Sequence, residues 1–323
     1  MTRVVAINQT GGPDVLSVED WDIGQPGPGQ ALLEQTAIGL NFIDTYQRGG
    51  LYPVALPFVG GNEGAGVVKA VGPGVTDVKV GDRVCYQGQI GAYAKERLVS
   101  ADRLLPIPDG VDDETAAAVA LKGLTAYYLL FKTWEVKPGQ TILWHAAAGG
   151  TGQIATQWAK SLGATVIGTA GGPEKVAIAK AHGCDHVIDY KAEDFAGRVR
   201  ELTNGQGVDV VYDGVGKSTF EGSLDCLRPR GLLASFGNAS GVVSIPDITL
   251  LSRKGSLYVT RPTGAHYFAT RAQLLEGAET LFAALSSGAI KVDIGARFTL
   301  EDVEKAHRAL EGRETTGSVV IIP

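Results

Sequence analysis

The chain has 323 residues, of which 44% are hydrophobic and 20% are charged, and its formal net charge is −6. This composition excludes a disordered chain, and the length exceeds what one small hydrophobic core supports, so we expect two domains. Because no cluster of Lys and Arg stands out, the charge argues against nucleic acid or an anionic membrane as the main partner.

Three cysteines, Cys85, Cys184 and Cys226, lie far apart and are odd in number. They are typical of buried thiols in a reducing compartment rather than of a disulfide framework. The N-terminus enters strand-like sequence at residues 3–7 without a basic-then-apolar signal, and no uninterrupted apolar run reaches about 18 residues. We therefore expect a cytoplasmic protein without a membrane-spanning segment.

Residues 1–122 contain several short strand candidates, among them 31–34, 66–71 and 82–86. Turn-forming glycines and prolines separate these runs. Several short strands with turn signals at this spacing favour a partly open β-barrel.

Segment 41–53 of this region combines amide, carboxylate, hydroxyl, guanidinium and phenol groups. A hydride-transfer site for an aromatic acceptor needs flat apolar walls and a few donors that orient carbonyl oxygens. Tyr46 and Tyr52 could supply both, and either could shuttle a proton. The alternative is that the tyrosines are half-buried barrel residues and that Arg48 is a surface charge.

Residues 123–262 alternate between strand and helix candidates. The predicted strands are 141–145, 165–169, 186–190, 208–212, 232–236 and 257–260, and the predicted helices are 153–162, 174–182, 193–203 and 219–227. Gly163 and Gly183 are suitable helix stops. This alternation predicts a doubly wound parallel sheet.

The first strand–helix turn of this region reads Ala-Ala-Gly-Gly-Thr-Gly at residues 147–152. Its spacing is that of G-x-G-x-x-G with Ala147 in the first glycine's place. Small residues permit a tight turn and a close approach to a pyrophosphate, and the following helix presents the positive end of its dipole. Because a strand precedes the turn and a helix follows it, we predict a dinucleotide site; the alternative is a tight turn without a ligand.

The choice of dinucleotide depends on charge. In an NAD site an acidic residue about 20 positions after the turn hydrogen-bonds the ribose. Here Thr169 and Ala170 occupy that place, and neither is acidic. Lys175 and Tyr190 can both bond a 2′-phosphate, so NADPH is preferred; the alternative is that Lys175 is a solvated lysine at a helix start.

A zinc site is not expected. The first 144 residues contain no histidine and a single cysteine. A catalytic zinc needs three protein ligands, and a structural zinc usually needs four. The histidines show no metal-binding spacing and are interpreted as ordinary polar or half-buried residues: His145, His182, His186, His266 and His307.

Residues 263–323 contain helix candidates at 270–286 and 301–310 and end on the strand candidate 318–322. We expect this tail to return to the N-terminal region, where the final strand would complete the sheet.

Several motifs carry a resemblance that extends over essentially the whole chain. They are NFIDTY at 41–46, GDRV at 81–84, LKGLTA at 121–126, AAAGGTG at 146–152, SFGN at 235–238 and TGS at 316–318. The chain resembles the zinc-free quinone oxidoreductase branch of the medium-chain dehydrogenase/reductase superfamily, the group of zeta-crystallin. Zinc-dependent relatives carry Gly-His-Glu where this chain has Gly61-Asn62-Glu63.

The resemblance implies a GroES-like catalytic domain, formed by residues 1–122 and completed by 263–323, and a Rossmann domain at 123–262. It also implies a homodimer that pairs through the Rossmann sheets.

The resemblance further implies roles for individual residues, with NADPH as the cofactor and a quinone as the substrate. The pyrophosphate would meet Gly149, Gly150 and Thr151. The 2′-phosphate would meet Gly171, Gly172, Lys175 and Tyr190. The nicotinamide side would be lined by Phe42, Ile43, Asp44, Tyr128, Val215, Gly237 and Asn238. Thr260, Arg261 and Arg313 would close over the cofactor. The quinone would lie against Tyr46 and Tyr52, with Asn41 and Arg48 nearby.

We therefore predict an NADPH-dependent quinone reductase in which the protein supplies position and a dry pocket rather than a nucleophile or a metal. One alternative is a reductase of α,β-unsaturated carbonyls, with Tyr52 as a proton donor. A second is a non-enzymatic NADPH-binding or RNA-binding protein; the acidic pI of 5.5 argues against RNA binding.

Overall fold

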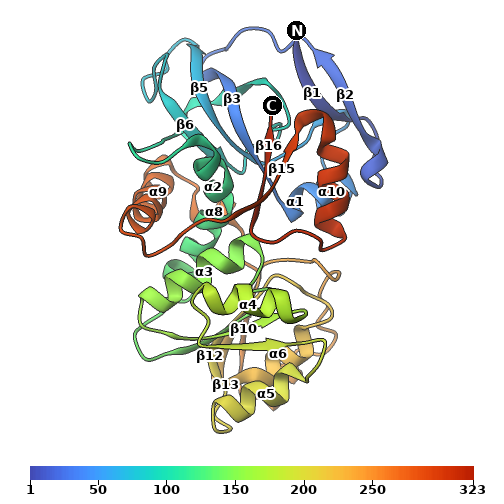
Figure 1. Cartoon of the computed structure of the whole chain (residues 1–323), viewed down its shortest axis with the longest axis vertical. Helices are drawn as coiled ribbons and strands as arrows, with labels where there is room; N and C mark the ends of the chain where they lie inside the picture. The colour runs from blue at the N-terminus through green and yellow to red at the C-terminus, as the bar shows by residue number, and fades with distance from the viewer. The chain divides into compact units, whose positions relative to one another are not determined.

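The computed structural model describes all residues from 1 to 323, and the chain divides into two compact units (Figure 1). The first unit comprises Met1–Leu124, Phe268–Phe282 and Val292–Pro323. The second unit comprises Thr125–Tyr267 and Ala283–Lys291. The chain thus passes between the units four times, and each unit is built from separate stretches of sequence.

The first unit contains a seven-stranded sheet. Its strands are β3 (Gln30–Leu40), β5 (Glu63–Val71), β6 (Arg83–Gln87), β7 (Glu96–Ser100), β8 (Leu105–Pro106), β15 (Ile294–Thr299) and β16 (Ser318–Ile322). The order is β15-β16-β3-β5-β6-β8, and β7 also pairs with β3. A three-stranded sheet with the order β2-β1-β4 consists of β1 (Thr2–Ile7), β2 (Leu16–Trp21) and β4 (Phe58–Val59).

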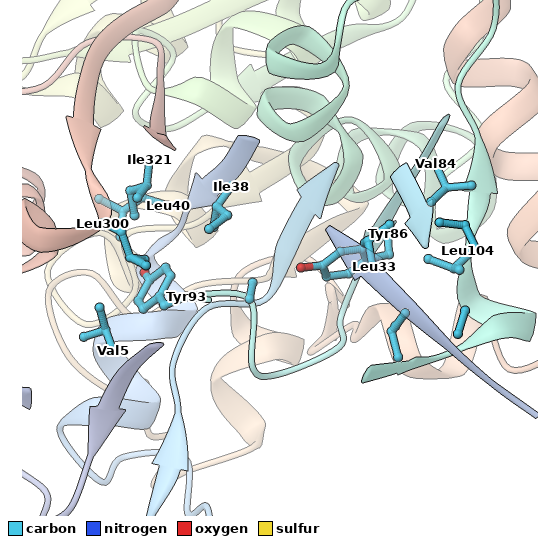
Figure 2. Packing of buried hydrophobic residues seen from close by; sticks show 14 of the residues in the cluster. Val5, Leu33, Ile38, Leu40, Val84, Tyr86, Tyr93, Leu104, Leu300 and Ile321 are labelled. Atoms are coloured by element: carbon cyan, nitrogen blue, oxygen red, sulfur yellow. The ribbon is translucent and has the colours of Figure 1, made fainter. Parts of the chain in front are cut away.

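The last strand confirms the expectation for the C-terminal tail, because β16 pairs antiparallel with β3 (Figure 1). Alternate side chains of β3 are buried, as a strand with one face on a core requires. Leu33 and Ile38 of β3 belong to one hydrophobic core with Tyr93, and Ile321 of β16 joins the same cluster (Figure 2). The strand thus returns because its apolar face completes this core.

Helices complete the first unit. They are α1 (Phe42–Arg48), α2 (Asp113–Tyr127), α9 (Arg271–Ser286) and α10 (Val303–Glu311), of which α2 and α9 continue into the second unit. Three short 3-10 turns cover Pro13–Val15, Ala101–Arg103 and Leu300–Asp302. A π-helical segment, Tyr128–Thr133, follows α2.

The second unit contains a six-stranded sheet in which all pairs are parallel. Its strands are β9 (Thr141–Trp144), β10 (Thr165–Ala170), β11 (His186–Asp189), β12 (Val208–Asp213), β13 (Leu227–Ser235) and β14 (Tyr258–Thr260). Its helices are α3 (Gly150–Ser161), α4 (Pro173–Ala181), α5 (Phe195–Leu202), α6 (Phe220–Cys226), α7 (Thr249–Arg253) and α8 (Gly264–Tyr267). The order β11-β10-β9-β12-β13-β14 confirms the predicted doubly wound parallel sheet.

The strand order reverses at β9, which has β10 on one side and β12 on the other. In open parallel sheets, ligands bind outside the carboxyl ends of the strands at such a reversal. None of the helices in the chain is long and apolar enough to cross a membrane.

Candidate functional site

The glycine-containing turn lies at the carboxyl end of β9, at the reversal of strand order. Ala146 adopts a positive φ of 54°, and Gly149 is the N-cap of α3, which begins at Gly150. A Cβ atom on Gly152 would lie only 2.5 Å from the Ala146 carbonyl oxygen. Glycine therefore lets α3 start unusually close to the strand end. The first N–H groups of this helix, including those of Gly150 and Thr151, lack intrahelical acceptors and so suit an anion.

The loop after β10 brings together residues that were predicted to hold a phosphate. Gly172 has φ of 93°, and a Cβ atom on Gly171 would collide with the Tyr190 phenol. Tyr190 itself is half-exposed, directly after β11. The loop leads directly into α4, and Lys175 lies in the first turn of this helix.

Sequence reasoning missed a carboxylate at this loop, that of Asp189 at the end of β11. Its Oδ1 accepts hydrogen bonds from the backbone N–H groups of Gly172 at 2.9 Å and Lys191 at 3.0 Å. These two donors lower the pKa of Asp189, so the group stays ionised and is directed at backbone amides. The expectation that the loop has no acidic neighbour therefore holds for β10 but not for the strand beside it.

The remaining predicted residues of the second unit lie after the other strands. Val215 lies after β12, and Gly237 and Asn238 lie after β13. Thr260 is the last residue of β14, and Arg261 follows it. A Cβ atom on Gly237 would overlap the Gly214 carbonyl oxygen, so these two loops touch through their backbones. Arg261 Nη1 donates to the Gly237 carbonyl oxygen at 2.9 Å, which ties the loop after β14 to the loop after β13.

Tyr128 begins the π-helical segment and is buried. Its ring stacks on that of Tyr267 with centroids 4.7 Å apart and planes 11° apart. Thr133, at the other end of the segment, donates to the Tyr267 hydroxyl at 2.8 Å. Because π-helical turns are frequent at functional sites, this segment is consistent with the predicted role of Tyr128.

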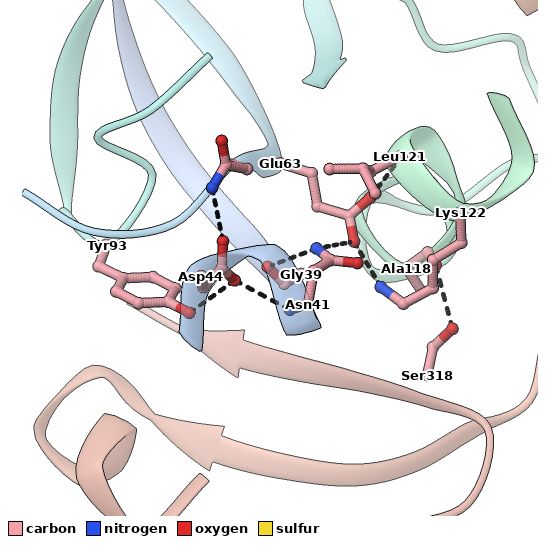
Figure 3. Close-up of polar contacts among 10 residues, drawn as sticks. Gly39, Asn41, Asp44, Glu63, Tyr93, Ala118, Leu121, Lys122 and Ser318 are labelled. Atoms are coloured by element: carbon pink, nitrogen blue, oxygen red, sulfur yellow. Dashed lines mark hydrogen bonds and ion pairs between the residues drawn. The ribbon is translucent and has the colours of Figure 1, made fainter. Parts of the chain in front are cut away.

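In the first unit, the predicted acceptor segment forms the short helix α1 with Asn41 as its N-cap. The Asn41 backbone N–H donates to Asp44 Oδ2 at 2.9 Å, so the third helical residue returns to the cap (Figure 3). This arrangement is the capping box, and it starts the helix where the sequence places these two residues. Phe42 is exposed and Ile43 is half-buried.

Three aromatic rings line one side of α1. The Phe42 and Tyr46 centroids are 6.4 Å apart, and those of Tyr46 and Tyr52 are 5.4 Å apart at an angle of 72°. The Tyr52 backbone N–H donates to the Tyr46 carbonyl oxygen at 3.1 Å, which brings the second ring back to the helix. Both tyrosines are half-buried, so each combines an apolar ring surface with a polar phenol group.

Asp44 faces the opposite way, into the protein. Its carboxylate accepts hydrogen bonds from Asn62 Nδ2 at 2.6 Å and from the Tyr93 hydroxyl at 2.8 Å. Burial raises the pKa of Asp44 to about 6, and the hydrogen bonds it accepts oppose that rise. The Tyr93 hydroxyl also lies 3.0 Å from His307 Nε2. Asp44 therefore anchors α1 and is not a surface group.

Arg48 is not the surface charge that one sequence alternative describes, nor is it placed as an acceptor contact. It is 3% exposed, and its guanidinium donates to Glu311 in a bidentate pair at 2.7 and 3.1 Å. Its other donors meet His307 Nδ1 at 2.8 Å and the Gly11 carbonyl oxygen at 3.1 Å. With its donors engaged in this way, Arg48 attaches α1 to α10.

Behind Asn41 lies a buried ion pair that sequence reasoning did not identify. Glu63, fully buried, accepts from Lys122 Nζ at 2.5 Å and from Asn41 Nδ2 at 2.8 Å (Figure 3). The backbone N–H of Leu121, in α2, donates to its other oxygen at 2.5 Å. The LKGLTA motif therefore contributes a cation whose charge is balanced inside the protein.

No group of three or more His, Cys, Asp or Glu side chains in the chain is arranged to hold a metal ion. Asn62, which stands in place of the histidine of zinc-dependent relatives, donates to Asp44 Oδ1 and to Gln47 Oε1, each at 2.6 Å. Glu63 pairs with Lys122 as described above.

Arg313, predicted to close over a cofactor, lies just after α10 in the first unit with φ of 59° and an exposed side chain. Apart from Tyr128 and Arg313, the predicted residues form two groups, one around α1 and one at the carboxyl ends of the parallel strands. A unit with this largely antiparallel sheet, in which only β15 and β16 pair parallel, and a second unit with a dinucleotide-type turn define the class of medium-chain dehydrogenases/reductases.

Comparison with known proteins agrees with this class. Residues 27–109 match the family model described as the alcohol dehydrogenase GroES-like domain, and residues 150–276 match the one described as zinc-binding dehydrogenase. The first unit therefore has the GroES-like fold and the second the Rossmann-like fold, as predicted.

Relatives with full-length similarity narrow the class. A quinone oxidoreductase of Pseudomonas aeruginosa is 51% identical over 325 residues, covering 100% of both chains. A 2-haloacrylate reductase of a Burkholderia species is 48% identical, covering 100% of this chain and 99% of the relative. The structure of Escherichia coli quinone oxidoreductase complexed with NADPH is 47% identical, covers 99% of this chain and 100% of that one, and superposes with a TM-score of 0.98. The chain therefore belongs to the quinone oxidoreductase family of the medium-chain dehydrogenases/reductases.

Proposed function

We propose that the chain is an NADPH-dependent quinone reductase that requires no metal. The observation that carries the proposal is the small-residue turn at the reversal of strand order, followed by a β10 that ends without an acid. An acid there would favour the free ribose hydroxyl of NAD, and its absence favours a phosphorylated ribose. The quinone oxidoreductases of P. aeruginosa and E. coli, and the NADPH in the latter's structure, support the same choice.

The cradle around the turn fits the cofactor. Gly152 and Gly171 each lie where a Cβ atom would strike a neighbouring atom, so only glycine permits these two close backbone approaches. We assign the pyrophosphate to Gly149, Gly150 and Thr151 and the 2′-phosphate to Gly171, Gly172, Lys175 and Tyr190. We assign the nicotinamide side to Phe42, Ile43, Tyr128, Val215, Gly237 and Asn238, and closure over the cofactor to Thr260, Arg261 and Arg313.

When bound, NADPH supplies reducing equivalents from C4 of its nicotinamide. The chain's own contribution is position. The rings of Phe42, Tyr46 and Tyr52 offer flat apolar surface to an aromatic acceptor, and the two phenols offer donors to its carbonyl oxygens. Asn41 and Asp44 hold the start of α1, and through it the place of these rings.

The Burkholderia relative supports a second candidate, reduction of an α,β-unsaturated carbonyl compound. Such a reaction needs a proton at the α-carbon in addition to hydride. Tyr52 is the residue that we would assign as the donor, because its phenol is half-buried beside Tyr46.

Steady-state oxidation of NADPH distinguishes the candidates. The panel contains 1,4-benzoquinone, a naphthoquinone, 2-chloroacrylate, a 2-alkenal and an enoyl thioester. We expect the highest kcat/KM with a quinone. A higher value with 2-chloroacrylate or an alkenal would favour the second candidate, and no oxidation with any of them would refute both.

We also propose a homodimer that forms through the second unit. β14 is the edge strand of the six-stranded sheet, and Tyr258 on it is 60% exposed. Val242 and Ile248 in the same unit are exposed as well. An edge strand leaves backbone groups that no neighbouring strand pairs with, and a second copy of β14 would pair with them. Light scattering should give twice the chain mass for the wild type, and the measured mass of Tyr258→Lys should be lower.

The three free and buried cysteines support a proposed cytoplasmic location.

A further inference from the structure

His145 stands directly between β9 and the glycine-containing turn and is 2% exposed. Its Nδ1 lies 2.9 Å from Thr169 Oγ1, on β10, and its Nε2 lies 3.0 Å from Ser223 Oγ, in α6. Both hydroxyl residues are buried. A histidine that sequence reasoning interpreted as an ordinary polar residue therefore bridges two other elements of the second unit.

The bridge continues to Asp213, the last residue of β12. Its Oδ2 accepts from Ser223 Oγ at 3.2 Å and from Thr219 Oγ1 at 2.7 Å. Its Oδ1 accepts from the backbone N–H groups of Val215 at 2.8 Å and Gly216 at 3.0 Å. The same carboxylate thus holds both the hydroxyl of Ser223 and the loop that follows β12.

The hydrogen bonds in this chain have a defined direction. Backbone amides only donate, so Asp213 acts as an acceptor throughout, and the single Ser223 proton is directed to it. The Ser223 oxygen must then accept from an Nε2–H of His145, which leaves Nδ1 to accept from the Thr169 hydroxyl. Burial lowers the pKa of His145, which agrees with a neutral ring in the Nε2–H form.

Backbone hydrogen bonds run between the same strands at the same level. The His145 N–H donates to the Tyr212 carbonyl oxygen at 3.0 Å, and the Ala147 N–H donates to the Thr169 carbonyl oxygen at 3.0 Å. The side chain of His145 therefore adds a second connection, beside these backbone hydrogen bonds, between the end of β9 and its neighbouring elements. Ala146, with its positive φ, follows at once.

We propose that His145 is a positioning residue for the dinucleotide. In this assignment the His145 relay, namely Thr169, His145, Ser223 and Asp213, holds the turn at 146–149 and the loop at 214–216 in fixed register. The proposal rests on the proposed binding of NADPH. Although Ser223, His145 and Asp213 are residue types of a nucleophile–base arrangement, Ser223 is fully buried and no substrate reaches it, so we assign no hydrolytic function.

An apolar ring of similar size could occupy the space of the His145 side chain but could not form its two hydrogen bonds. The Thr169 hydroxyl would lose its acceptor, and the Ser223 oxygen would lose its donor while its own proton stays directed to Asp213. The first elements to shift would be those that the relay joins, which are the turn and the loop. The cofactor site would loosen, while the acceptor residues around α1 belong to the other unit and keep their own anchors.

The test compares His145→Phe with His145→Gln and Ser223→Ala. We expect His145→Phe to raise the Kd for NADPH, measured by fluorescence titration, about tenfold or more, with kcat at saturating NADPH and the KM for 1,4-benzoquinone within about twofold of wild type. His145→Gln keeps a donor toward Ser223 and should recover part of the affinity. Ser223→Ala cuts the relay with a small side chain and should weaken NADPH as well, which covers the case in which the phenylalanine variant does not fold. His186→Phe, the same change at an exposed histidine on β11, is the matched control and should bind as wild type does.

Three results separate the hypotheses. Unchanged NADPH affinity in folded His145→Phe and Ser223→Ala overturns the relay, even where the melting temperature falls. Losses in kcat and in affinity for the quinone that are as large as the loss in NADPH affinity also overturn the relay, because they indicate a general structural defect. Failure of the wild-type protein to bind NADPH refutes the proposed function itself, and the relay with it.

Discussion

Replacing Lys122 by methionine should destabilise the protein by about 3–5 kcal/mol, the usual cost of breaking a buried ion pair from one side. The Lys122 side chain is 7% exposed and that of Glu63 is 0% exposed. Methionine retains most of the apolar stem of lysine but removes the charge. The Glu63 carboxylate would then be left with only Asn41 Nδ2 and the Leu121 N–H as donors, neither of which carries a charge.

A double-mutant cycle isolates the charge effect. Glu63→Gln alone leaves a buried, unpaired ammonium and should cost a similar amount. In the double variant both charges are gone, and the glutamine oxygen can still accept from Asn41 or Leu121. We therefore expect the double variant to lie within about 2 kcal/mol of wild type, far from the sum of the single effects.

Urea denaturation followed by circular dichroism measures the free energy of unfolding for each corner of the cycle. The matched control is the exposed pair of Lys69 and Glu34, which joins the same sheet at 2.7 Å with side chains 48% and 51% exposed. Lys69→Met should leave the denaturation midpoint unchanged, since exposed pairs contribute little. If Lys122→Met shifts the midpoint no more than this control, or if the two single effects add, the reasoning from buried charge is wrong.

Four further outcomes are expected. Lys175→Ala should weaken NADPH binding by roughly 1.5–3 kcal/mol and leave NADH binding unchanged, because a charged hydrogen bond to the 2′-phosphate is lost; equal affinities of the wild type for the two cofactors would contradict this. Tyr46→Ala and Tyr52→Ala should lower kcat/KM for 1,4-benzoquinone at constant NADPH affinity, and the corresponding Phe variants should cost only roughly 0.5–1.5 kcal/mol, whereas a loss of about 10²–10⁴ in rate would identify an obligatory proton donor. Since the folded protein raises the pKa of Asp44 from 3.8 to about 6, it binds that proton more tightly than the unfolded chain does. Ionisation of Asp44 should therefore remove up to about 3 kcal/mol of stability as the pH rises from about 4 to 6. Burial and the Arg48 guanidinium lower the pKa of His307 to about 3, so its contribution to stability changes with pH in the opposite direction, but it is common to wild type and Asp44→Asn. The stability difference between these two proteins, measured in urea at each pH, should therefore follow the Asp44 trend, and a flat difference would exclude the raised pKa. Finally, exhaustive chelation should leave activity intact, and elemental analysis should find no stoichiometric zinc.

The parts of the fold that were predictable have local signals. The turn at 147–152, the parallel strands around it and the glycine stops follow from short apolar runs and small residues. Boundaries were less accurate. β11 ends at Asp189 rather than at Tyr190, and β3 extends over Gln30–Leu40 where only 31–34 were predicted. Pairing with β16, β5 and β7 supports the longer strand, and such partners are distant in sequence.

Helix α2 was missed altogether. Asp113–Tyr127 contains an alanine-rich run after two acidic residues, which is a usable signal for a helix start. Short strand-like runs and turn residues dominate the sequence that precedes this helix, so its signal is weak against that background. Lys122 lies in this helix, and its ammonium group donates to the Glu63 carboxylate, 59 positions earlier in the chain. The sequence therefore did not reveal this pair.

Buried polar residues were the least predictable part of the site. Arg48 and His307 are 259 positions apart, and His145 and Ser223 are 78 apart. Each side chain taken alone is typical of a surface. Only the fold brings the partners together, and a polar group enters a core when its hydrogen bonds are satisfied there.

These partnerships explain why the two candidate sites share a design. α1 has seven residues, too few for a helix that is stable by itself, so its place is determined by what holds it. Arg48 ties its end to α10, and Asp44 ties its start to Tyr93. The turn after β9 has no regular structure of its own, and His145 ties it to β10 and α6. In both units, short elements carry the residues expected to meet a ligand, while buried polar side chains from distant segments set their geometry. We therefore expect the interior polar groups, and not only the half-buried tyrosines and the glycines, to determine how well each site is formed.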